Sequence, residues 1–313
     1  SNVFRIREIN MNHKKQAVFK SGKNVVASLL TAGVVLAGTA YAADHYISVN
    51  DGAVAADSRG NYKNDGATGR NSTAIGVDAS AKNQGATAIG AATSATNNAA
   101  ISIGTYSNAS GVSSTAIGQG TLASANAATA IGRQANASGN GSTAIGSASK
   151  ASGSAAIAFG SGTSASGTNS TALGQGAQSS GINSSAVGTK ANASGLGSSA
   201  FGSGSVASGK YASAYGTNSN ASGDASVAVG LQSKASGKGA VAIGRNAVAS
   251  DEYSVALGAN STTSAAVGTT NATVGGVNYG GFAGTAPAAT VSVGKKDFER
   301  TITNVAAGRI TSD

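Results

Sequence analysis

Large apolar residues return with one fixed period along most of this chain, each one place before a glycine. The repeating core is close to Ser-x-Ala-φ-Gly, where φ is a large apolar residue, and fourteen copies run between residues 71 and 258 without an insertion or deletion. A globular core does not hold such a register, whereas a stack of equal coils must, because each coil packs only on its neighbours. The pattern predicts a β-solenoid with one 14-residue unit per coil, about 65–70 Å long.

Each unit is numbered here from its closing glycine, which is position 1, as in Gly146. Two short strands are predicted per unit, at positions 11–14 (residues 142–145) and 4–6 (residues 135–137). Position 8 is glycine in nine units, Asn or Asp in three (Asn83, Asn97, Asp251), and Ala125 in one. Because Gly, Asn and Asp tolerate a positive φ, tight turns are predicted at positions 1 and 8.

Side chains alternate between the two faces of a strand, so positions 11 and 13 share one face and positions 4 and 6 share another. Within the units, position 13 is alanine except at Ser102, and position 6 is alanine except at Ser179. These small residues are predicted to meet inside a narrow, flattened coil. Position 5 is mostly polar, as in Asn136 and Lys150, and is predicted to face water.

Position 14 forms a row of large apolar residues on the outer face of the first strand, beside the Thr, Ser, Val or Ile of position 12. An exposed row of this length is larger than a soluble monomer tolerates. Other copies of the chain around a common axis are the predicted cover, and three copies suit a wedge-shaped coil, although the spacing leaves the number open. The candidate trimer-interface residues are Ile75, Ile89, Ile103, Ile117, Ile131, Ile145, Phe159, Leu173, Val187, Phe201, Tyr215, Val229, Ile243 and Leu257.

The first 42 residues have the pattern of an export signal. Four lysines between residues 14 and 23 precede an apolar stretch at 25–39, and Ala40-Tyr41-Ala42 matches an A-x-A cleavage site. A membrane anchor is the alternative, but the stretch is diluted by Gly and Ser and is shorter than about 20 apolar residues. Cleavage would remove six basic residues and one acidic residue, so the formal charge of +9 falls to about +4, which weakens a nucleic-acid-binding interpretation. Met11, the single methionine, is a candidate start that would place residues 1–10 upstream.

The remaining chain divides into four segments. Residues 43–70 form an irregular N-terminal segment with a candidate strand at 46–49. Residues 71–268 hold the repeats, ending in a shortened unit at 266–268. Residues 269–289 are a Gly/Ala/Thr-rich connection with the single proline, Pro287, and residues 290–313 include a charged cluster.

These units resemble the YadA-like head repeats of trimeric autotransporter adhesins, whose consensus is close to Asn-Ser-x-Ala-φ-Gly. Residues 71–76, 169–174 and 183–188 match it in full, and residues 291–294 and 300–308 are similar to that family's neck motif. The resemblance covers about residues 71–310. It implies an all-β fold, a left-handed parallel β-roll of 14-residue coils, a homotrimer, and a neck leading to a coiled-coil stalk and an outer-membrane anchor.

The chain departs from the full family pattern. It shows no heptad stalk and no anchor strands, so it is expected to be truncated just past the neck at 290–313. The export signal also lacks the extended N-terminal signature common in the family.

The sequence offers no constellation for catalysis, cofactor binding or metal binding. It has no cysteine, two histidines (His13 and His45) and isolated carboxylates, which cannot assemble a triad, dyad or metal cluster. Asp251-Glu252 fits a turn variant of position 8 with a solvated charge. The eight Lys and Arg residues of the array sit at different repeat positions against four acids, which favours a scattered solvated surface over a polyanion-binding track.

The predicted function is that of a cell-surface adhesin head, displayed on the outer membrane of a Gram-negative cell through an anchor absent from this chain. Repetition offers many equivalent weak sites, so avidity replaces a single deep pocket. The resemblance implies a host matrix protein such as collagen, or a cell-surface receptor, as partner. The candidate ligand-binding residues are Asn71, Ser72, Asn169, Ser170, Asn183 and Ser184, although packing also explains the serines.

Two other functions compete with adhesion. An ice-binding or other non-adhesive structural solenoid is favoured by threonines at position 12, such as Thr73 and Thr87. That row, however, shares its face with Ile and Phe, and later units replace Thr by Ser or Val. A polysaccharide lyase on a β-helix is disfavoured by the missing catalytic groups.

Overall fold

The computed structural model describes residues 65–306 and two short strands, β1 (Val25–Val26) and β2 (Thr39–Ala40), which pair antiparallel. The chain forms two units, residues 1–48 and 49–313, and the second contains the repeats. The candidate strand at 46–49, most of the predicted export signal and the end of the predicted neck lie outside the described residues. The described residues contain no helix, and so none that could cross a membrane.

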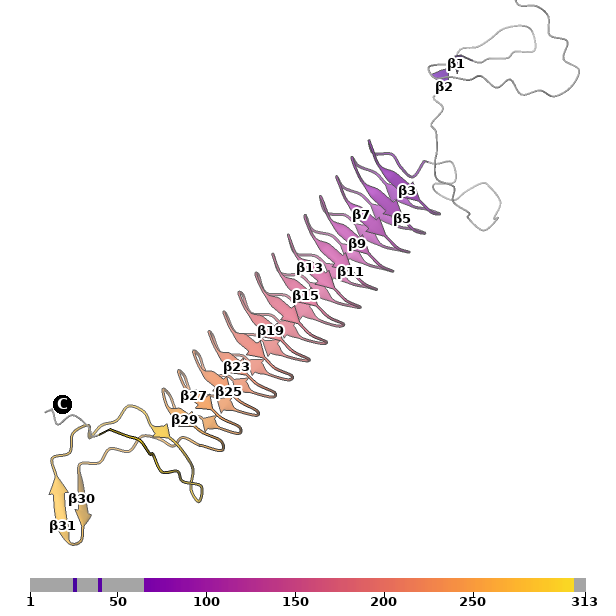
Figure 1. Ribbon diagram of the computed structural model, residues 1–313. Helices are drawn as coiled ribbons and strands as arrows, with labels where there is room; N and C mark the ends of the chain where they lie inside the picture. The colour runs from indigo at the N-terminus through magenta and orange to yellow at the C-terminus, as the bar shows by residue number, and fades with distance from the viewer. Residues whose placement is uncertain (1–24, 27–38, 41–64, 307–313) are drawn as a thin grey trace, which may run out of the picture. The chain divides into compact units, whose positions relative to one another are not determined.

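The repeats form a parallel β-solenoid of two sheets, whose strands stack coil upon coil in Figure 1. The 15-stranded sheet contains β3 (Thr73–Ile75), β5 (Thr87–Ile89), β7 (Ile101–Ile103), β9 (Thr115–Ile117), β11 (Thr129–Ile131), β13 (Thr143–Ile145), β15 (Ile157–Phe159), β17 (Thr171–Leu173), β19 (Ser185–Val187), β21 (Ser199–Phe201), β23 (Ser213–Tyr215), β25 (Val227–Val229), β27 (Val241–Ile243), β29 (Val255–Leu257) and β32 (Val291–Ser292). The 13-stranded sheet contains β4 (Ser80–Ala81), β6 (Ser94–Ala95), β8 (Asn108–Ala109), β10 (Leu122–Ala123), β12 (Asn136–Ala137), β14 (Lys150–Ala151), β16 (Ser164–Ala165), β18 (Gln178–Ser179), β20 (Asn192–Ala193), β22 (Val206–Ala207), β24 (Asn220–Ala221), β26 (Lys234–Ala235) and β28 (Val248–Ala249).

The register of both sheets follows the sequence period. From β3 to β29 each strand pairs in parallel with the equivalent strand of the next coil, so equivalent residues of successive coils lie side by side, as Ala130, Ala144 and Ala158 do. This confirms the predicted all-β parallel roll of 14-residue coils, with strands one residue shorter than expected. The left-handed sense and the three-copy assembly stay predictions.

Two β-turns close each coil. The N–H of position 11 donates to the carbonyl of position 8, as from Ser142 to Gly139 at 3.0 Å, and the N–H of position 4 donates to the carbonyl of position 1, as from Ser149 to Gly146 at 3.2 Å, except where position 4 is Thr93, Thr121 or Thr163. The third residue of each turn has a positive φ, for example 55° at Ala148. Since the second residue does not, both turns are of type II.

The predicted positive φ is confirmed at position 1 and wrong at position 8. Gly139 has an ordinary φ, but a Cβ built on it would lie 1.9 Å from the carbonyl oxygen of Gly153 in the next coil. The Gly139 N–H also donates to the Ala151 carbonyl at 3.3 Å, a bond that the described turns with Asn97 and Ala125 lack. Glycine is therefore favoured at position 8 because it has no side chain, and the positive φ lies two residues later.

The interior of the roll contains only small side chains. The alanines of positions 6 and 13 from residue 81 to residue 256 are fully buried, and the largest fully buried side chains are threonines such as Thr93. The two exceptions to the alanine rows are both hydrogen-bonded across the interior. The Ser102 Oγ lies 2.7 Å from the Ser107 Oγ, and the Ser179 Oγ lies 2.6 Å from the Ser184 Oγ. Each of these two buried hydroxyls thus has a partner, whereas the buried Oγ atoms of Ser142, Ser170, Ser198 and Ser226 have none.

The interior should therefore reject volume that the outer face accepts. We expect Ala144→Leu to destabilise the roll by about 1–3 kcal/mol or more, because Ala144 is fully buried among other alanines. Asn136→Leu should be nearly neutral, because Leu122 already occupies the same row one coil earlier and the Asn136 Oδ1 has no hydrogen-bond partner to lose. Thermal melts of the two variants check this, and the opposite ranking would contradict the assignment of inside and outside.

The last strand of the larger sheet comes from a distant segment. Residues 266–268, predicted to close a shortened unit, join neither sheet. Instead Val291–Ser292 (β32) pairs in parallel with Val255 and Ala256 of β29. Between them lies an antiparallel hairpin of β30 (Asn271–Val274) and β31 (Val277–Gly280). The first residues of the predicted neck thus form the fifteenth strand of the larger sheet.

Arg300 covers the C-terminal end of the stack. Its guanidinium donates to the carbonyl oxygens of Val293 and Ala259, each at 2.5 Å, and to the Ser261 Oγ at 3.2 Å. It also lies 5.0 Å from the centre of the Phe298 ring. A terminal coil has no further coil to pair with, so one planar cation satisfies two carbonyl groups that another coil would otherwise bond.

Candidate binding surfaces of the roll

The candidate functional sites are surfaces. The described residues hold no group of three His, Cys, Asp or Glu side chains that could bind a metal ion. The interior of the coils is filled by alanine, serine and threonine. A partner of this roll must therefore contact one of its outer faces or edges.

The apolar stripe, defined as the position-14 row, lies along the outer face of the 15-stranded sheet. Its side chains are half-buried or exposed in the single chain, and Phe159 is 51% exposed. The rings of Phe201 and Tyr215 stack along it with centroids 5.3 Å apart. Ile101 and Ile157 of position 12 widen it. The described chain leaves this stripe without full cover.

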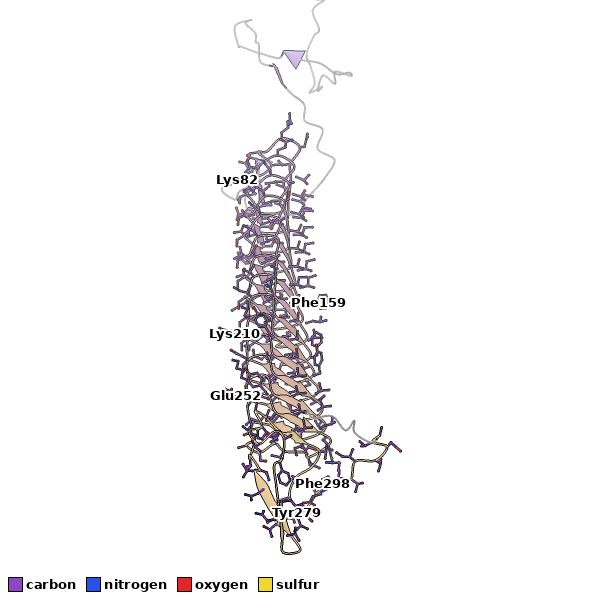
Figure 2. All side chains as sticks on the ribbon, turned by 90° about the vertical axis from the view of Figure 1, so that its left-hand side faces the viewer. Lys82, Phe159, Lys210, Glu252, Tyr279 and Phe298 are labelled. Carbon is purple, nitrogen blue, oxygen red and sulfur yellow. The ribbon has the colours of Figure 1, made fainter. Side chains whose placement is uncertain are left out.

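The turn edge, defined as positions 9 and 10, carries charged and aromatic residues. Figure 2 shows Lys210 and Glu252 of this edge, with nearby Lys82, along one side of the roll and Phe159 along the other. Copies packed on the apolar stripe would therefore leave the turn edge accessible. Position 9 of this edge is mostly polar in the first coils, with Arg70 and the exposed Val112 as exceptions, and it carries Ile182, Leu196 and four consecutive charges in the later coils.

Four charges of alternating sign occupy position 9 in four consecutive coils: Lys210, Asp224, Lys238 and Glu252. All four side chains are exposed. Backbone bonds hold the coils in register beneath them, since the N–H groups of Ala225, Gly239 and Tyr253 donate to the carbonyls of Lys210, Asp224 and Lys238 at 2.7–2.8 Å. The sequence interpretation of scattered charges missed this charge column, which the fixed repeat spacing could have revealed.

The cation at Lys238 is stabilised by its neighbours. A hydrogen bond with the Tyr253 hydroxyl raises the pKa of Lys238 above its ordinary value, and the negative charges of Glu252 and Asp224 raise it further. Its Nζ lies 5.8 Å from the centre of the Tyr253 ring. Lys238 therefore keeps its positive charge throughout the neutral and mildly alkaline range.

Tyr211 and Tyr253 occupy position 10 beside the charge column. Both have a φ of 57°, which is unusual for a bulky residue, and both rings are more than half exposed. Each ring lies against the glycine one coil earlier: a Cβ on Gly197 would be 2.8 Å from the Tyr211 Cδ1, and one on Gly239 would be 2.7 Å from the Tyr253 Cδ1. Only glycine leaves room for a ring in this place.

The three predicted ligand-binding asparagines also lie at position 10. Asn71, Asn169 and Asn183 are exposed, with φ values of 59°, 55° and 56°. The Asn169 Nδ2 donates to the Asn183 Oδ1 at 3.1 Å, so two of them form a short ladder. Their amide groups are accessible to a partner.

The three serines that follow these asparagines face inward. Ser170 and Ser184 are fully buried, and Ser72 is partly buried. The Ser184 Oγ donates to the Gly181 carbonyl at 2.7 Å, which reinforces the turn. The hydroxyls of Ser72 and Ser184 are used in turn closure, and that of Ser170 is buried without a hydrogen-bond partner, so none of them is available to a ligand while the coil is folded.

The model of the YadA head domain repeat, in its two-copy form, matches seven consecutive segments of the chain. The matched residues are 67–93, 95–121, 123–149, 151–177, 179–205, 207–233 and 235–261, more than half of the sequence. The chain belongs to the YadA head repeat family. Each matched segment spans two coils of this YadA head, in agreement with the 14-residue register of both sheets.

Known relatives share parts of this head. The autotransporter adhesin BtaE of Brucella suis biovar 1 (strain 1330) is 61% identical over 51 residues, 16% of this chain and 7% of BtaE, so the chain spans a small part of that relative. The C-terminal YadA-like domain of BPSL2063 from Burkholderia pseudomallei is 58% identical, covering 25% of this chain and 36% of that one, with a TM-score of 0.23. The collagen-binding domain of Yersinia adhesin YadA is 25% identical, covering 71% and 80%, with a TM-score of 0.22.

Proposed function

We propose that this chain is the head of a surface-displayed adhesin, which attaches a bacterial cell to host matrix or to other cells. The observation that carries the proposal is the rigid ladder of a YadA head, which presents a similar outer face from every coil. A surface of many equivalent weak contacts gains strength from avidity. The matching segment of BtaE supports adhesion and export to the surface of a Gram-negative cell. Membership of this family favours a role without catalysis.

The working unit of the proposal is a homotrimer. Three copies whose apolar stripes face a common axis would remove from water the half-exposed side chains of Phe159, Leu173 and Tyr215. The turn edge of each copy would stay accessible, because it lies on the side of the roll away from Phe159. Display through a stalk and an outer-membrane anchor belongs to the same proposal.

The ligand class follows from the family resemblance. A matrix protein such as collagen, or a cell-surface receptor, is the proposed partner, and the exposed amides of Asn71, Asn169 and Asn183 are proposed contacts. The half-buried threonines of position 12, such as Thr129 and Thr143, lie beside the apolar stripe. A trimer that covers the stripe also covers that row, so the ice-binding alternative loses its flat surface.

Removal of whole coils tests the proposal. Deleting residues 147–174 removes two whole coils and joins Gly146, at position 1, to Gln175, at position 2, so the register is kept. We expect a folded head whose adhesion to collagen-coated surfaces is weaker. Further deletions of single whole coils should lower adhesion step by step. A deletion one residue short of a whole coil is the matched control, because it breaks the ladder and should lower the melting temperature.

Two outcomes would contradict this form of the proposal. Loss of all adhesion on removing one unit would indicate a single localised site. Unchanged adhesion after removal of most units would place binding outside the roll. Inhibition of ice recrystallisation by the trimer at micromolar concentration would favour the alternative function.

A further inference from the structure

The charge column is complementary in charge to a second copy of itself that runs in the opposite direction. Read toward the C-terminus, Lys210, Asp224, Lys238 and Glu252 carry the signs plus, minus, plus and minus, and read backward the signs are opposite at every place. Stacked strands are about 4.8 Å apart, so the four charges span about 14 Å of the turn edge. A copy of this edge running in the opposite direction therefore presents an unlike charge to each member.

In the neighbouring column of position 10, the order of large and small side chains is the same in both directions. It places Tyr211 and Tyr253 at its two ends and the small residues Ala225 and Gly239 between them. Both rings are more than half exposed and lie against glycines of the preceding coils. Reversal of this column therefore brings ring to ring and small residue to small residue.

We propose that the turn edge between residues 210 and 253 docks antiparallel on the same edge of a second copy of this chain. The two edges would be related by a twofold axis that lies in their interface, level with the midpoint between the coils of Asp224 and Lys238. Lys210 would then face the partner's Glu252, Asp224 the partner's Lys238, and Tyr211 the partner's Tyr253. Such an isologous contact is closed, so each turn edge binds one other edge, and a trimeric head with three accessible edges can contact up to three other heads.

The charges select this orientation over others. Parallel alignment in register sets Lys210 on the partner's Lys210 and repeats a like-charge contact at all four places, which opposes association. A parallel alignment shifted by one coil pairs three charges but is not closed by a twofold axis. The antiparallel pair alone matches both columns, and heads that project toward each other from two facing cells would meet in this orientation.

Each contact in the pair is individually weak. Exposed ion pairs stabilise little and are screened by salt. The charges are therefore expected to fix register and exclude wrong partners, while strength comes from several turn edges per assembly and many assemblies per surface. The inference rests on the proposed surface display, and it extends the partner from host material to a second head.

An alternating column also relieves repulsion between stacked coils of one chain, since like charges on adjacent strands are destabilising. The decisive variant must therefore keep the alternation. The fourfold swap Lys210→Glu, Asp224→Lys, Lys238→Glu and Glu252→Lys leaves both the net charge and the alternation unchanged. Swapped heads still fit one another antiparallel, whereas a swapped head and a wild-type head face like charges at all four places.

The experiment couples the full chain, wild type or swapped, to beads of two colours and counts contacts between beads at low salt. We expect each protein to cluster with itself, with mixed-colour contacts at least tenfold fewer than same-colour contacts, and clustering to fall when salt is raised to about 0.5 M. Equal melting curves of the two proteins establish that folding is unaffected. Equal mixing of the colours, a preference for mixed contacts or an absence of wild-type clustering would each overturn the inference. Adhesion to collagen-coated plates is measured separately, so a failure there is distinguishable from a failure of self-association.

Discussion

Gly146→Ala is expected to destabilise the roll by roughly 2–5 kcal/mol per chain, the combined cost of an unfavourable φ and an overpacked contact. Gly146 has a φ of 127°, and a Cβ built on it would lie 2.5 Å from the carbonyl oxygen of Gly160 in the next coil. Neither strain can relax alone, because the backbone of the next coil is itself fixed by the ladder. All fourteen units have glycine at this place.

Gly141→Ala is the matched control in the same coil. Gly141 has a φ of 63°, but a Cβ there would meet nothing within 4 Å. The equivalent residues one coil earlier and one coil later are Ala127 and Ala155, each with a φ of 52°. This substitution should therefore cost about 1 kcal/mol or less, since the folded chain accepts alanine in this turn and the unfolded chain loses entropy.

Thermal or denaturant unfolding of the two variants measures the difference. Each coil packs only on its neighbours, so the damage at Gly146 should spread to adjacent coils and broaden the transition as well as lower it. Similar stability of Gly146→Ala and Gly141→Ala would contradict the account, because it would mean that the close approach of position 1 to the next coil does not constrain the roll.

The comparison of these two glycines shows how far the sequence could predict the coil. Period, strand positions and the inward alanine rows follow from the recurrence of residue types, and the sheets confirm them. Glycine, however, meets two different needs, a positive φ or the absence of a side chain, and composition alone does not separate them. Gly139 meets only the second need, whereas Tyr211 has a positive φ without being glycine. The predicted φ at position 8 is wrong for this reason.

The binding surfaces were predictable to different degrees. The exposure of the apolar stripe followed from alternation along the strand, because a row of large residues cannot enter an interior of alanines. The burial of Ser170 and Ser184 was only half anticipated, since a Ser beside an Asn fits both a ligand site and a turn. The fifteenth strand, Val291–Ser292, was missed because a long excursion separates it from β29. Its similarity to residues 101–104 was a usable signal.

Phe159→Asp is expected to leave the roll of each chain folded and to abolish the proposed trimer. In the single chain the Phe159 ring is already half exposed, so an aspartate there meets water and costs the roll little. Around a shared axis the same three carboxylates would be enclosed together, and each unpaired buried charge costs several kcal/mol.

Lys150→Asp is the control for Phe159→Asp, because Lys150 is an exposed position-5 residue of β14 on the other sheet and should tolerate the same new charge. Light scattering gives the mass of each protein at micromolar concentration, and circular dichroism reports whether the roll persists. A trimer that survives Phe159→Asp would place the assembly surface elsewhere, and a wild-type head that is a stable soluble monomer would contradict the proposed trimer. A fall from the trimer mass to the monomer mass with retained β-structure, seen in Phe159→Asp but not in Lys150→Asp, would instead show that assembly depends on the apolar stripe. The two variants differ only in which face of the coil receives the charge.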